Sequence, residues 1–104
     1  MSRVHIASEC MSARVSRSDG ARLRSLIETH WGDEDALVLD FSGVRIASVS
    51  FFDESLGLLA RTHPLDELQR RVRVENIDPS DRALLNQIVL SRARERSSAN
   101  DASL

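Results

Sequence analysis

The sequence predicts a small α/β domain whose strands and helices alternate in the order β(β)αβαβα. Residues 36–39 form a nearly continuous apolar run, typical of a central strand covered on both faces. Residues 72–75 alternate valine with charged residues, which is typical of a strand with one wetter face, and a helical stripe of aliphatic residues follows from residue 84. Because strands that alternate with helices imply parallel crossovers, we expect a mixed sheet of about four strands against about three helices.

The N-terminal part of this pattern is two short strands and a helix. Residues 4–7 are weakly patterned as a first strand, and residues 11–15 alternate apolar and polar residues. The two segments either pair as a hairpin or form one bent strand. The first helix then begins with Ser16 or Ser18 as its N-cap and carries Asp19 in its first turn, where the helix dipole favours a negative charge.

The second and third helices have their own start signals. Ser50 precedes an apolar stripe and Asp53 follows three residues later, so we expect Ser50 to cap the second helix in a capping box with Asp53. This helix should run to about Arg61. The third helix should begin at Pro79 with Asp78 as its cap.

The length and composition predict one domain. The chain has 104 residues, of which 41% are hydrophobic, enough for one core. We expect the domain to span residues 1–96 and a disordered polar tail to span residues 97–104. No apolar run approaches the ~20 residues that cross a membrane, and one cysteine, Cys10, permits no internal disulfide. A cytoplasmic location is therefore expected.

The charges exclude several functions. The net charge is −2 and aromatic residues make up 4%, which disfavours nucleic-acid binding. All 14 cationic residues are arginine, so a P-loop lysine and a Schiff-base lysine are absent. The lack of lysine is typical of a GC-rich bacterial genome. The three histidines are scattered without metal-ligand spacing, and we expect neither a metal nor a cofactor.

Three motifs in order resemble the STAS-like domain family of unknown function, which is related to the domains of sulphate transporters and anti-sigma-factor antagonists. The motifs are VSRSDGARL, LDFSGVRIASVSFFDESLG and VENIDPSDRALLNQIV. The resemblance covers about residues 11–92 and implies a small sheet with helices against it. It also implies a non-enzymatic switch that binds partner proteins, such as a serine kinase with a histidine-kinase-type ATPase fold.

In the antagonists, a serine at the start of the second helix is phosphorylated within a pattern like Asp-Ser-Ser-Gly. Aligned from LDFSGV, that pattern falls on residues 48–51, and the acceptor position is Val49, which has no hydroxyl. Ser48 and Ser50 flank it and are the candidate phospho-acceptors. For Ser50, the favoured interpretation is a helix cap, and a phosphate there would also meet the positive end of a helix dipole. Ser48 is expected in the loop, less committed to backbone bonding, and is the better steric candidate for a phosphate, although its favoured interpretation is an ordinary turn serine.

Other polar residues near this segment are candidates for binding. Asp40 and Ser42 follow the central strand, where α/β sheets gather ligands, although the favoured role of Asp40 is to hydrogen-bond the turn that follows it. Arg45, Asp53 and Glu54 are candidate partner contacts, with Asp53 also serving the cap. Arg17 would pair with Asp40 or with Asp53 if the first helix starts beside the second.

The favoured function is a non-catalytic regulatory module that docks a signalling ATPase or kinase through residues 45–57, with serine phosphorylation as a control. The alternative is a sensor that binds a small ligand or nucleotide near Asp40 and the following loop. An enzyme is disfavoured because the chain has no Gly-x-Ser-x-Gly nucleophile motif. Binding of nucleic acid or membrane is not expected, and the protein is either a monomer or a homodimer.

Overall fold

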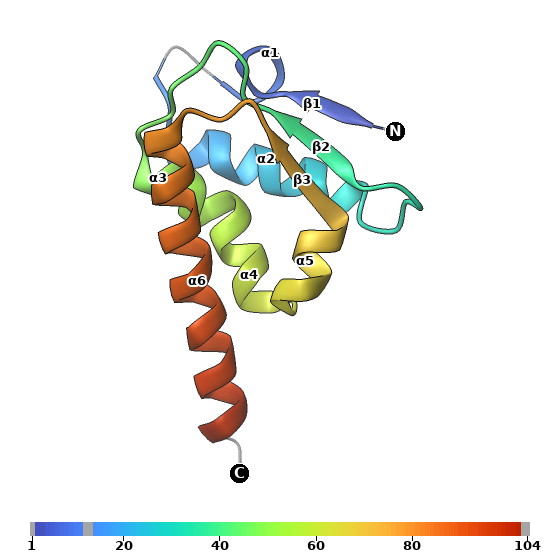
Figure 1. Ribbon diagram of the computed structural model, residues 1–104, viewed down its shortest axis with the longest axis vertical. Coiled ribbons are helices and arrows are strands. Elements are labelled where there is room, and N and C mark those ends of the chain that lie inside the picture. Colours follow the sequence, from blue (N-terminus) through green and yellow to red (C-terminus); the bar gives the residue numbers. More distant parts are fainter. Residues whose placement is uncertain (1, 12–13, 103–104) are drawn as a thin grey trace.

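The sheet holds three parallel strands in the order β1-β2-β3, so β2 lies in the centre and β3 at one edge (Figure 1). β1 spans Arg3–His5, β2 spans Leu37–Asp40 and β3 spans Val72–Glu75 in the computed structural model, which describes residues 2–11 and 14–102, with side chains through residue 96. The apolar run of β2 is buried along its whole length, as the sequence predicts for a central strand.

The two faces of the sheet differ in chemistry. Leu39 stands opposite Val4 on β1 and Val74 on β3, and all three belong to or pack against the hydrophobic core. The core also contains the buried side chains of the helices, so the helices cover this face. Because side chains alternate along a strand, Asp40 lies on the opposite face, where Arg3 bonds it.

The first long helix, α2, spans Arg17–Thr29. Its start is a capping box of Ser16 and Asp19, whereas the sequence predicts only a serine cap and an Asp19 placed in the first turn. The hydroxyl of Ser16 accepts a hydrogen bond from the backbone N–H of Asp19, and the carboxylate of Asp19 accepts one from the N–H of Ser16 at 3.1 Å. Of the two expected caps, Ser16 and Ser18, the structure uses Ser16.

The second long helix is continuous but contains a π-helical turn. This helix, called the middle helix below, consists of α3 (Val49–Phe52), η1 (Asp53–Gly57) and α4 (Leu58–Thr62). Phe51 and Phe52 are fully buried in the core at its start. The expected helix from residue 50 to about residue 61 is therefore present, with its start one residue earlier.

Gly20 allows α2 to pass very close to this helix. A Cβ atom on Gly20 would lie 2.5 Å from the carbonyl oxygen of Phe51 and 3.0 Å from the Cβ of Glu54. Contacts of this length do not occur between real atoms, so the site requires glycine. The close approach sets the N-terminal halves of the two helices side by side.

Three further helices complete the chain. α1 (Ile6–Glu9) follows β1, and α5 (Leu65–Arg71) occupies the segment after Pro64, where the sequence pattern indicates only a break. α6 (Pro79–Ala102) packs on α4 and η1, and Figure 1 shows it extending beyond the rest of the domain. The α/β class is confirmed, but the two short helices were not expected.

The sheet also differs from the expected one. The described strands are all parallel, and the mixed, four-stranded arrangement is not found among them. The expected second strand at residues 11–15 falls partly on residues 12–13, which lie outside the described residues, and its described residues are not in a strand. The expected tail, residues 97–104, overlaps α6 as far as residue 102. Its disorder stays a prediction.

Candidate functional site

The candidate site is the loop from residue 41 to residue 48 and the helix start that follows it. Asp40 closes the first turn of this loop. One of its oxygens accepts hydrogen bonds from the N–H and the hydroxyl of Ser42 and, at 3.1 Å, from the side-chain amide of Asn76. The other accepts one from Arg3 at 3.0 Å. The predicted turn-closing role of Asp40 is therefore confirmed.

These bonds also fix the charge of Asp40. The Ser42 hydroxyl, followed by the Asn76 amide and the Ser42 N–H, holds the pKa of the Asp40 carboxyl well below its usual range. Both carboxylate oxygens are occupied by groups of the same chain. A ligand-binding role for Asp40 and Ser42 stays a prediction, and a ligand there would have to displace one of these donors.

Asp81, on α6, holds the second half of the loop by hydrogen bonds. It lies in the first turn of α6 and is 1% exposed, yet its carboxylate points away from its own helix. It accepts hydrogen bonds from the backbone N–H of Ile46 at 2.6 Å and of Ala47 at 2.8 Å. Ala47 has a φ of 48°, a left-handed conformation that costs energy for a residue with a Cβ. The two bonds stabilise that conformation and fix the loop.

Sequence reasoning named Asp78 as the cap of α6 and missed this role of Asp81. A signal was present, because one aspartate precedes α6 and a second lies in its first turn, while the helix needs one cap. Asp78 already serves as that cap, with its carboxylate accepting hydrogen bonds from the N–H groups of Ser80 and Asp81. The second carboxylate is therefore available for a distant partner.

The cap of the second helix is Ser48, and the expectation that Ser50 caps it is wrong. The Ser48 hydroxyl accepts a hydrogen bond from the N–H of Phe51 at 3.2 Å, and α3 begins at Val49. Ser50 is the second residue of the helix, with its hydroxyl 3.5 Å from a guanidinium nitrogen of Arg17. Each serine lies three residues before a backbone N–H that its hydroxyl could cap. The conformation of the loop held by Asp81 selects Ser48 as the cap.

Asp53 does not belong to a capping box. Its two oxygens pair with the guanidinium of Arg92 on α6, each at 2.7 Å. This bidentate bond lowers the pKa of Asp53 and raises that of Arg92. Asp53 therefore ties the middle helix to α6.

Glu54 ties the middle helix to α2. Its oxygens pair with Arg17 at 2.6 Å and with Arg24 at 3.0 Å, and the bond from Arg17 is the largest cause of its lowered pKa. The two helices lie side by side as expected, but Arg17 pairs with Glu54 rather than with Asp40 or Asp53. Contact of Asp53 or Glu54 with another protein stays a prediction.

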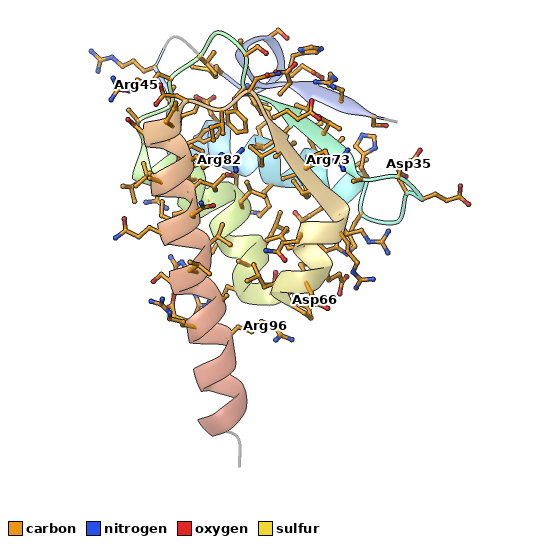
Figure 2. All side chains as sticks on the ribbon, viewed as in Figure 1. Asp35, Arg45, Asp66, Arg73, Arg82 and Arg96 are labelled. Carbon is orange, nitrogen blue, oxygen red and sulfur yellow. The ribbon has the colours of Figure 1, made fainter. Side chains whose placement is uncertain are left out.

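Two residues of the site face outward. Arg45 is exposed on the loop, as Figure 2 shows, and no described residue bonds it. Val49, at the first position of α3, is 58% exposed. Beside Val49 runs a groove of about 420 Å³ between the middle helix and α6, with Leu84 and Ile88 among its lining residues and the Asp53–Arg92 pair on its wall. The site thus presents an apolar side chain next to a groove.

In the described part of the chain, the side chains that could bind a metal ion do not form a cluster. No group of three or more histidine, cysteine, aspartate or glutamate side chains is placed there to hold a metal ion. His63 stacks on Trp31 with ring centroids 4.3 Å apart, and His5 and His30 lie elsewhere, beside Asp40 and Asp33. Among the described helices, none is long and apolar enough to span a bilayer.

The fold and the site together define a small α/β domain with a fixed loop at the carboxyl end of its central strand. Comparison with known families gives a match over residues 19–82 to the STAS-like domain of unknown function. The chain belongs to this family, and the resemblance inferred from the three motifs is confirmed. No curated protein and no solved structure matches the chain significantly.

Proposed function

We propose that this protein is a non-catalytic regulatory module of the cytoplasm that docks another protein through residues 45–57. The observation that carries the proposal is Val49, an aliphatic side chain 58% exposed at the start of a helix and beside a groove. A monomer leaves such a side chain in water without gain, whereas a partner that covers it removes apolar surface from water. Arg45, exposed nearby, adds a charged contact at the rim.

The rigidity of the loop supports the same proposal. Ile46 and Ala47 are held by Asp81, and the start of α3 is held by the Ser48 cap. A surface that is already ordered loses little conformational entropy when it binds. The partner we propose is a signalling ATPase or serine kinase of the histidine-kinase-type fold. This choice rests on analogy with the relatives of the family.

A phosphate on Ser50 is the proposed control. Ser50 lies in the first turn of the helix, and its hydroxyl is 3.5 Å from Arg17. A phosphate there would meet both the helix N-terminus and this guanidinium. It would also compete with Glu54 for Arg17, and so loosen the contact between α2 and the middle helix. Ser48 is the weaker acceptor because its hydroxyl is engaged as the cap.

The docking surface can be tested by photocrosslinking in the native host. A photoreactive phenylalanine analogue at position 49 should give an adduct with an ATPase or kinase, and the same analogue at position 94, exposed on α6, should not. The purified ATPase should then bind the wild-type chain, and Val49→Arg should weaken binding about ten-fold or more. Equal adducts from both positions, or unchanged binding by Val49→Arg, would contradict the proposal.

The phosphate control has a separate test. Phosphopeptide mapping of protein purified from the native host should find a phosphate that Ser50→Ala removes and Ser48→Ala retains. Docking is independent of this result. An unmodified segment, together with full partner binding by the Ser48→Ala/Ser50→Ala double variant, would eliminate the control while leaving the docking surface in place.

A further inference from the structure

A second surface, on the far side of α6 from the Val49 groove, begins at the free edge of β3. The N–H of Phe41 donates to the carbonyl of Glu75 at 3.0 Å, so that carbonyl points toward the central strand. Backbone groups alternate in direction along a strand, so the N–H and C=O of Val74 point away from the sheet. β3 is the last strand on this side, and no described residue bonds these two groups. The edge is open to another strand.

An apolar groove lies directly beneath this edge. It has a volume of about 130 Å³ and lies between β3, α5, α6 and η1. Aliphatic residues line it on every side, namely Leu56, Leu65, Leu68, Val72, Val74, Leu85 and Val89. A cavity of roughly this size holds one compact apolar group. A strand added to β3 would direct alternate side chains toward the helices, and one of them would enter the groove.

The surroundings of the groove are basic. Arg82 lies one turn before Asn86, a lining residue, and Arg96 lies on the same side of α6 two turns after Val89 (Figure 2). Arg73 projects from β3 itself. No described residue forms an ion pair or a hydrogen bond with the side chain of any of these three arginines. One unpaired carboxylate, Asp66, sits nearby at the start of α5, so the surface is net positive.

We infer that this surface binds an extended, acidic segment of a partner protein as a fourth strand beside β3. The open N–H and C=O of Val74 supply main-chain hydrogen bonds, and the groove takes an apolar side chain of the segment. Arg73 faces the acidic residues next to that side chain, because they point to the same face of the sheet, and Arg82 and Arg96 add positive charge on the α6 side that attracts the acidic segment as a whole. This surface shares no lining residue with the Val49 groove, so it does not depend on the proposed docking of an ATPase.

The test uses the full chain and a synthetic peptide as probe. The probe is an eight-residue, N-acetylated and C-amidated peptide of alternating glutamate and valine, and binding is measured by isothermal titration calorimetry. We expect binding of one peptide per chain. The same peptide with lysine in place of glutamate should not bind, and neither should one N-methylated at alternate residues, which loses its strand hydrogen bonds.

Variants of the protein locate the binding surface. Arg82→Glu should weaken binding about ten-fold or more, while the matched control Arg94→Glu, exposed on the outer side of α6, should stay within about two-fold. Asn86→Trp fills the groove from an exposed position and should abolish binding with little change in Tm. Val49→Arg should leave peptide binding unchanged.

Several results would overturn the inference. These are absent binding of the glutamate peptide, equal binding of the lysine peptide, full binding of the N-methylated peptide, or equal effects of Arg82→Glu and Arg94→Glu. A chain that binds no peptide and forms a dimer that Asn86→Trp dissociates would show that the edge receives a second copy instead, which also overturns the acidic partner.

Discussion

The loop between β2 and α3 has two different sides. The polar groups of its inner side are hydrogen-bonded within the domain, whereas its outer side exposes a charged and an apolar side chain. On the inner side, Asp40 and Asp81 accept hydrogen bonds from the loop, and no buried side-chain nitrogen or oxygen among the described residues lacks a partner. On the outer side, Arg45 is unpaired and Val49 is exposed. The inner side fixes the shape, and the outer side is available for recognition.

Internal bonds distinguish Asp81 and Asp53 from the acidic residues on the surface, which look the same in the sequence. Asp81 and Asp53 both lie in helices, and both bond groups more than thirty residues away. Neither carboxylate is free to contact a partner without breaking a bond inside the domain. We therefore propose that recognition uses residues whose loss leaves the fold intact, while these internally bonded carboxylates stabilise the domain.

The largest expected effect comes from removing the inner anchor. Asp81→Ala removes the acceptor of two backbone N–H groups, that of Ile46, which is buried, and that of Ala47, which is held in a left-handed conformation. Chemical denaturation should show a loss of about 3 kcal/mol in the free energy of unfolding. Asp66→Ala, an exposed aspartate in the first turn of α5, is the matched control and should change it little. Similar losses for both would remove the special role of Asp81.

The contact between α2 and the middle helix gives the next largest effect. Gly20→Ala places a methyl group 2.5 Å from the carbonyl oxygen of Phe51, so the helices must separate, and we expect a loss of about 2 kcal/mol. Gly32→Ala meets nothing within 4 Å and should be neutral or slightly stabilising. Thermal unfolding measures both. A neutral Gly20→Ala would mean that the helices do not touch as described.

Acid should weaken the ties of the middle helix. The pKa values of Asp53 and Glu54 are lowered in the folded chain, mainly by Arg92 and Arg17. A carboxyl with a depressed folded pKa stabilises the fold above its unfolded pKa and loses that contribution as the pH falls from about 5 through the folded pKa. Arg92→Met should make the fall of unfolding free energy across this window shallower than in the wild type. The control Arg94→Met should retain the wild-type slope, and equal slopes for both variants would contradict the assignment.

The smallest effect on stability is expected on the outer side. Val49→Arg changes an exposed side chain and should alter the free energy of unfolding by no more than about 0.5 kcal/mol, while it weakens the proposed docking about ten-fold or more. Denaturation and binding to the captured ATPase are measured on the same preparation. A large loss of stability would mean that Val49 stabilises the fold and is not free for recognition.

The sequence indicates the local features correctly. The serine cap of α2, the start of α6 at Pro79 and the buried strand β2 each depend on residues within a few positions of one another. The turn closed by Asp40 and Ser42 is of the same kind. Such features follow from short spacing rules, and the family motifs support the same arrangement.

The features that sequence reasoning missed depend on residues far apart in the chain. Asp81 reaches a loop 35 residues earlier, and Arg92 reaches Asp53 across 39 residues. The choice of Ser48 over Ser50 as cap is set by that loop, since both serines satisfy the local pattern. Pro64 indicates a break in the pattern, and α5 forms after it because Leu68 is buried against the core.

The central claim is that Asp81 holds the loop from residue 41 to residue 48 in one conformation. Amide hydrogen exchange followed by NMR tests this claim most directly. The N–H groups of Ile46 and Ala47 should exchange as slowly as those of the central strand, because both are bonded to a buried carboxylate. In Asp81→Asn, protection should fall at one or both positions. Exchange of these amides in the wild type as fast as that of Glu34, in an exposed loop, would contradict the account.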